Sequence, residues 1–215
     1  KGSNSEELTN EFIKVGRIQY YIIFLMCTGF IVLGKQFILS WVGEEYSDSY
    51  YTALWLIIPV CIPLIQNLGL SIMQAMNKYK FKSISSFIMT IFNIILSIIL
   101  VKKYGAIGAA AGTGITLIIC NIILINIYYY KVIGLDVLKF WNSIIHMTIF
   151  LILPLCILLI FKNIIVINGI KGFIMYGIVY VLEYSIFAYI FVANNYEKNT
   201  LNKLLSKFKI KEGAK

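Results

Sequence analysis

Uncharged polar side chains recur at helical spacing within two long apolar stretches of the sequence. The two sets are Gln66, Asn67, Ser71 and Gln74, and Ser86, Thr90, Asn93 and Ser97. Residues three or four positions apart share one helix face, so each set forms a polar stripe. Amides and hydroxyls can bind an uncharged polar ligand in a water-accessible cavity, for which we take six residues as candidates: Gln66, Asn67, Ser71, Gln74, Thr90 and Asn93. The other interpretation is hydrogen bonding between neighbouring helices.

Ionisable side chains are scarce inside the apolar stretches, and Glu183 stands out among them. It lies near the middle of the last stretch. A carboxylate inside a membrane span is a functional hypothesis by default, so Glu183 is the candidate for ion coupling. The simpler interpretation is that Glu183 is protonated and hydrogen-bonds a neighbour. His146 is expected at the membrane interface, and Lys35 can extend outward from the end of the first stretch.

No pattern in the sequence predicts catalysis, a cofactor or a metal, so we expect the protein not to be an enzyme. The segment Gly29-Phe-Ile-Val-Leu-Gly34-Lys35-Gln36 approaches the phosphate-loop signature, but Gln36 replaces the required hydroxyl residue. The cysteines show no paired spacing and are interpreted as packing residues: Cys27, Cys61, Cys120 and Cys156. The net charge of +9 does not point to nucleic acid, because the basic residues flank apolar stretches, where they contact anionic lipid headgroups.

The composition excludes an ordinary water-soluble globule. Hydrophobic residues make up 60% of the 215 residues and charged residues 13%, with a mean hydropathy of +0.83. About 20 consecutive apolar residues span a bilayer as a helix. Six windows are free of charge or interrupted by one charged residue: 18–43, 49–77, 83–101, 104–130, 140–161 and 172–196. They predict an all-α integral membrane fold with six transmembrane helices.

Helix-breaking and small residues predict how these spans bend and pack. Pro59 and Pro63 each remove a backbone hydrogen bond, so we expect a helix hinge in the second span. Gly105, Gly108 and Gly112 place a small face on the fourth span, which predicts close approach of another helix.

The distribution of Lys and Arg predicts the orientation in the membrane. If the amino terminus is cytoplasmic, 14 of the 19 basic residues lie on the cytoplasmic side. Positive charge is retained on that side, so we expect a multi-pass protein of the inner membrane with both termini cytoplasmic. The expected segments are an interfacial amphipathic helix (1–16), four helices of a transport lobe (17–141), two further transmembrane helices (142–195) and a basic amphipathic cytoplasmic tail (196–215).

A resemblance to a known family rests on several short segments in order. They are Gly16-Arg17-Ile-Gln19, Gly34-Lys35-Gln36-Phe37, Trp41-Val-Gly43, Ile57-Ile-Pro59, Gln66-Asn67-Leu-Gly69, Gln74-Ala-Met-Asn77-Lys78-Tyr-Lys80-Phe-Lys82, Lys103-Tyr-Gly105-Ala-Ile-Gly108 and Asn126-Ile-Tyr128-Tyr-Tyr-Lys131-Val-Ile-Gly134-Leu-Asp136. Residues 17–141 resemble the carboxy-terminal half of the polysaccharide-export flippases, the oligosaccharide repeat-unit translocases of the MATE-like multidrug/oligosaccharidyl-lipid/polysaccharide superfamily.

The resemblance implies that the six spans are the last six of a fourteen-helix flippase. It implies movement of undecaprenyl-pyrophosphate-linked oligosaccharide across the cytoplasmic membrane, with Arg17 and Lys35 as candidate contacts of the pyrophosphate. The implied partners are membrane lipid, the lipid-linked oligosaccharide, an amino-terminal lobe of the same chain, and a polysaccharide polymerase or glycosyltransferases.

Two alternatives stay open. One is a cation-coupled MATE-type exporter of small molecules, for which Glu183 would be the coupling carboxylate. The other is a membrane assembly partner of polysaccharide synthesis enzymes that transports nothing. The chain begins with Lys1 rather than Met, so we expect it to be a fragment of a longer polypeptide.

Overall fold

The computed structural model describes the backbone of residues 2–164 and 169–212 and the side chains of residues 5–162, 164 and 169–203. Every regular element in this part of the chain is helical, which confirms the all-α prediction. The longer helices are α1 (Gly2–Trp41), α2 (Asp48–Ile65), α4 (Lys80–Ile118), α6 (Val137–Ile164), α7 (Gly169–Phe187) and α8 (Asn195–Glu212). The shorter ones are η1 (Glu44–Tyr46), α3 (Asn67–Ala75), α5 (Asn126–Tyr128) and the π-helical segments η2 (Ile119–Ile125), η3 (Tyr129–Ile133) and η4 (Ala188–Val192).

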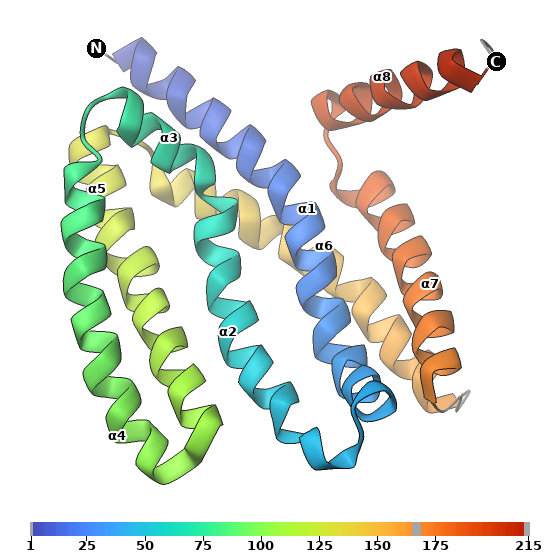
Figure 1. Cartoon of the computed structure of the whole chain (residues 1–215). Coiled ribbons are helices and arrows are strands. Elements are labelled where there is room, and N and C mark those ends of the chain that lie inside the picture. Colours follow the sequence, from blue (N-terminus) through green and yellow to red (C-terminus); the bar gives the residue numbers. More distant parts are fainter. Residues whose placement is uncertain (1, 165–168, 213–215) are drawn as a thin grey trace.

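Several helical stretches are long and apolar enough to cross a bilayer. Within the described residues they are Ser5–Trp41, Glu44–Ile65, Lys80–Ile133, Val137–Lys162 and Gly169–Val192. The third has 54 residues and would be about 80 Å long if straight, against about 30 Å of hydrocarbon. It is not straight, because Gly105 leaves helical geometry (φ 58°, ψ −137°) and the chain reverses into two antiparallel arms, 80–104 and 106–133 (Figure 1).

The connections divide between two ends of the helix bundle. In Figure 1 the start of α1, the short helix α3 and helix α8 lie at the top. The turn Glu44–Tyr46 and the reversal between the two arms of α4 lie at the bottom. Helix α1 runs unbroken through position 16, so the expected interfacial segment and the first span form a single helix.

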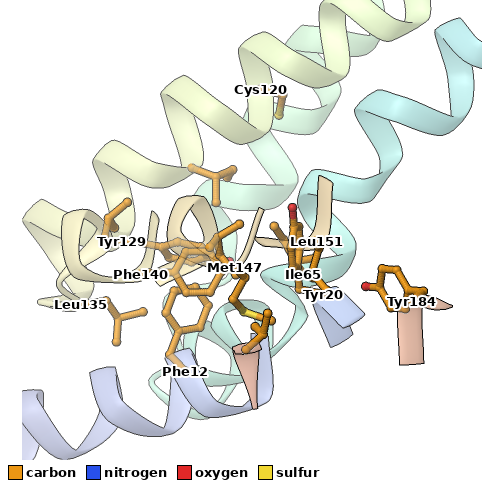
Figure 2. Packing of buried hydrophobic residues seen from close by; sticks show 14 of the residues in the cluster. Phe12, Tyr20, Ile65, Cys120, Tyr129, Leu135, Phe140, Met147, Leu151 and Tyr184 are labelled. Atoms are coloured by element: carbon orange, nitrogen blue, oxygen red, sulfur yellow. The ribbon is translucent and has the colours of Figure 1, made fainter. Parts of the chain in front are cut away.

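Part of the buried apolar cluster lies where α1 meets α6 and η3 (Figure 2). The ring of Phe12 stacks on Phe140 with centroids 4.4 Å apart and meets Tyr129 edge-on at 5.8 Å. A Cβ atom at Gly16 would lie 2.4 Å from the Phe140 ring, so the glycine allows α6 to approach α1 closely.

Buried hydroxyl groups join α1 to α7. The hydroxyls of Tyr180 and Thr28 are 2.5 Å apart, and Tyr184 donates to the carbonyl of Tyr21 at 2.8 Å. These hydroxyls therefore each have a partner, which a polar group needs when it is shielded from water. These bonds place α7 beside α1.

The first arm of α4, in contrast to this buried core, exposes large apolar side chains along its length. They include Phe87, Ile88, Ile95, Ile98 and Ile99. A water-soluble protein rarely exposes so large a contiguous apolar surface. This surface suits contact with lipid chains.

Candidate functional site

The break between α2 and α3 is the first feature of the candidate cavity. Pro59 and Pro63 both lie inside α2, and each lacks the N–H that would bond the carbonyl four residues earlier. Helical geometry is lost at Gln66 (φ −103°, ψ 13°), just after the turn that Pro63 weakens, and α3 begins at Asn67.

Gln66 is buried at this break, with 2% of its surface exposed. Its amide nitrogen donates to Oδ1 of Asn126 at 2.7 Å, and its Oε1 has no hydrogen-bond partner. Asn126 lies between the π-helical segments η2 and η3, a kind of irregularity that is frequent at functional sites. The buried amide of Gln66 therefore links the α2–α3 break to α5 and does not face an open cavity.

The other candidates on α3 behave differently. Asn67, Ser71 and Gln74 are all exposed and follow one another at helical spacing, whereas Ile72 and Met73 are buried on the opposite face. We call Asn67, Ser71 and Gln74 the α3 polar face. Of the six residues predicted to line a cavity, these three lie together on one exposed helix face.

The polar stripe on the first arm of α4 is used for packing between the two arms. Asn93 Oδ1 accepts hydrogen bonds from Ser97 at 2.9 Å and from Thr113 of the second arm at 3.3 Å. Thr90 is exposed, and its hydroxyl donates to the carbonyl of Ser86 in its own helix at 2.8 Å. Asn93 thus fits the interhelical interpretation, while Thr90 is the more accessible group.

The small residues of the second arm lie against the first arm. A Cβ atom at Gly108 would be 2.2 Å from the carbonyl oxygen of Leu100, and one at Gly112 would be 2.5 Å from Oγ of Ser97. At the reversal itself, Gly105 has a positive φ of 58°, which glycine adopts without steric cost. The helix that approaches the glycine face is therefore the preceding arm of the same element.

Arg17 lies in a buried polar cluster that joins four elements. Its guanidinium donates to Glu197 of α8 twice (Nε–Oε1 2.6 Å, Nη2–Oε2 3.0 Å), to Ser143 of α6 at 3.1 Å and to the carbonyl of Val192 at 3.0 Å. The side chains of Arg17 and Glu197 are 12% and 7% exposed. Two-point pairing of this kind is both strong and geometrically selective.

Glu197 also caps the start of helix α8, which begins at Asn195. Its Oε2 accepts from the backbone N–H of Asn194 at 2.9 Å, and its own N–H donates to Oδ1 of Asn194 at 2.9 Å. This reciprocal pair is a capping box, with Asn194 in place of the usual serine or threonine. Sequence reasoning missed Glu197, although the spacing Asn194-x-x-Glu197 before α8 is a recognisable helix-start signal.

The two remaining ionisable candidates, Lys35 and Glu183, are not part of the Arg17–Glu197 cluster. Lys35 is exposed near the end of α1, and Glu183 is partly buried in α7 with an Oε2 atom that has no hydrogen-bond partner. In the described part of the chain, no three His, Cys, Asp or Glu side chains gather in a way that could hold a metal ion.

Comparison of the chain with protein-family models, curated proteins and solved structures gives no match.

Proposed function

We propose that the chain is part of a flippase that moves undecaprenyl-pyrophosphate-linked oligosaccharide repeat units across the cytoplasmic membrane for cell-surface polysaccharide biosynthesis. The observation that carries this proposal is the α3 polar face, an exposed row of two amides and a hydroxyl directly after a helix break. Sugars offer many hydroxyls, and neutral donors and acceptors bind them without a counter-ion. Broken helices lining a polar path are a recurring arrangement in transporters.

The proposal includes six membrane crossings with both termini cytoplasmic. Its support is the reversal at Gly105, which divides the 54-residue stretch into two arms that are each long enough to cross. The excess of Lys and Arg supports the cytoplasmic assignment of the end that carries α3 and α8.

The pyrophosphate requires cations, and the two candidates differ in availability. Every guanidinium nitrogen of Arg17 already donates a hydrogen bond, so contact with a phosphate would compete with Glu197. Lys35 is exposed and could receive the phosphate directly. We therefore propose that Lys35 contacts the pyrophosphate directly. Arg17 could contact it only after α8 moves away and releases the guanidinium from Glu197.

The test replaces the α3 polar face in the full-length protein. Asn67→Ala, Ser71→Ala and Gln74→Ala together should lower surface polysaccharide at least about tenfold, because three hydrogen bonds of about 1 kcal/mol each are lost. The matched control is Thr52→Ala, Ser185→Ala and Thr200→Ala, whose hydroxyls all bond carbonyls of their own helices. Normal polysaccharide from the triple α3 variant at equal protein level would contradict the proposal and favour an assembly role.

A second candidate, the cation-coupled exporter, has one observation in its favour. Oε2 of Glu183 is buried without a partner, as expected for a carboxylate that exchanges a cation or proton. Transport measured against pH in the full-length Glu183→Gln variant separates the two proposals. An altered pH profile supports coupling through Glu183, and an unaltered profile rejects it.

A further inference from the structure

A groove of about 380 Å³ opens between α1, the end of α7 and α8. Ile18, Ile22 and Met26 of α1 form one wall, and Leu201 of α8 contributes to the other. All four side chains are exposed, Met26 to 70%. The volume falls within the range of small-molecule sites, about 300–1,000 Å³, and the walls are suited to a hydrocarbon chain.

The charge at this groove is positive. Glu197 lines it, but its carboxylate is neutralised by Arg17. Lys198 also lines it, with its ammonium 5.2 Å from the centroid of the Tyr189 ring, and it has no ion-pair partner among the described residues. Four further lysines follow Lys198 in the sequence of α8: Lys203, Lys207, Lys209 and Lys211.

We propose that the groove binds one acyl chain of an anionic phospholipid, with Lys198 contacting the headgroup phosphate. An apolar slot continuous with a basic helix along the membrane surface offers a site for each half of such a lipid, and basic pockets at helix ends are known to hold anionic headgroups. The Arg17–Glu197 pair has a defined part in this site, because it holds α8 in position and cancels the charge that would repel the phosphate. Such a lipid site requires only that the chain lies in a bilayer, and it does not depend on the transported substrate.

The experiment places a tryptophan in the groove and asks which lipid quenches it. In a background with Trp41, Trp55 and Trp141 replaced by Phe, the full 215-residue chain carrying Met26→Trp is reconstituted with brominated phosphatidylglycerol or brominated phosphatidylcholine. We expect the relative binding constant to favour phosphatidylglycerol about fivefold, because one lysine near an anionic headgroup contributes about that factor. Lys198→Gln should return the ratio to about one.

The matched control is Ile95→Trp in the same background. Ile95 is exposed to 55%, lines no part of the groove and lies near the middle of the charge-free stretch 83–101. We expect a ratio of about one at this position. Equal ratios at the two positions, or a ratio unchanged by Lys198→Gln, would overturn the proposal. The absence of quenching at position 26 by either lipid would also overturn it, because the groove would then be covered by protein.

A second measurement avoids the tryptophan substitutions. Phosphatidylglycerol that remains bound to the unmodified chain through detergent purification is counted by mass spectrometry and compared with that on Lys198→Gln. Loss of one bound lipid supports the site, and an unchanged count overturns it.

Discussion

Arg17 and Glu197 are separated by 180 positions in the sequence and meet in a two-point ion pair, with Nε 2.6 Å from Oε1 and Nη2 3.0 Å from Oε2. The hydroxyl of Tyr21 donates to the same carboxylate at 3.0 Å. The pair holds the first turn of α8 against α1, and the carboxylate caps that turn at the same time. One buried side chain therefore determines where α8 begins and where it lies.

Removing one partner of this pair should destabilise the fold strongly. Arg17→Gln leaves Glu197 buried and unpaired, and such a loss costs about 3–5 kcal/mol. We expect the midpoint of thermal unfolding in detergent to fall by several degrees. Arg17→Met combined with Glu197→Gln should recover most of the loss, because no charge is left unpaired. Asn194→Ala, which removes only the cap, should cost about 1 kcal/mol. Equal stability of Arg17→Gln and the unmodified chain would show that the pair is absent in the membrane.

The two arms of α4 provide a second test. Gly108→Ala should destabilise the hairpin, because the added Cβ would meet the backbone carbonyl of Leu100, which cannot move aside as a side chain can. Gly177 of α7 is the control, because no atom lies within 4 Å of the added Cβ. Gly177→Ala should leave stability unchanged or raise it by up to about 1 kcal/mol, since alanine favours helix. Unfolding in mixed micelles measures both, and equal effects would contradict the packing of the arms.

The packing of α1 against α2 can be tested with native cysteines. The free thiols of Cys27 on α1 and Cys61 on α2 lie beside each other where these two helices pack. Mild oxidation should therefore join them, with a loss of two mass units and of two alkylatable thiols, while Cys120 and Cys156 stay reactive after unfolding. The Cys27→Ser variant should show no such loss. A bond that forms between Cys61 and Cys120 instead would mean that the helices are arranged differently.

The orientation of the α4 reversal predicts a labelling pattern in intact cells. In a cysteine-free variant, Tyr104→Cys should react with a membrane-impermeant thiol reagent added outside the cell, because Tyr104 is exposed beside the reversal. Lys78→Cys, in the turn before α4, should react only after the cells are broken. The opposite pattern would invert the proposed topology, and labelling of both positions from outside would contradict the crossing of the first arm.

The sequence predicts the helices far better than it predicts the site. Long apolar runs identify the helical stretches because a bilayer leaves a backbone few other ways to satisfy its hydrogen bonds. The close packing at Gly108 and Gly112 follows from residue size, which is also visible in the sequence. The sequence predicts Gly105 on the same packed face, but it lies at the reversal, with no atom within 4 Å of an added Cβ. Helical spacing alone cannot tell which side of a polar stripe is exposed, so the sequence does not distinguish Gln66, which is buried, from Asn67, which is exposed.

The contacts of Arg17 show a second limit. A basic residue at the entrance to a span predicts a phosphate contact or a lipid contact equally well, and nothing near it in the sequence indicates an acid 180 positions away. The Asn194-x-x-Glu197 spacing does indicate a helix start. Its pairing with Arg17 depends on how α1, α6 and α8 come together, which is a property of the packed structure and not of any local segment.

Movement of lipid-linked oligosaccharide across a membrane tests the central proposal most directly. Inverted membrane vesicles that contain the full-length protein are loaded on their outer face with a labelled undecaprenyl-pyrophosphate oligosaccharide, and the fraction protected from an added glycosidase is followed with time. We predict protection with the unmodified protein and the Thr52/Ser185/Thr200 control, and at least about tenfold slower protection when Asn67, Ser71 and Gln74 are all replaced by alanine. Equal rates for the unmodified protein and the triple α3 variant would contradict the account.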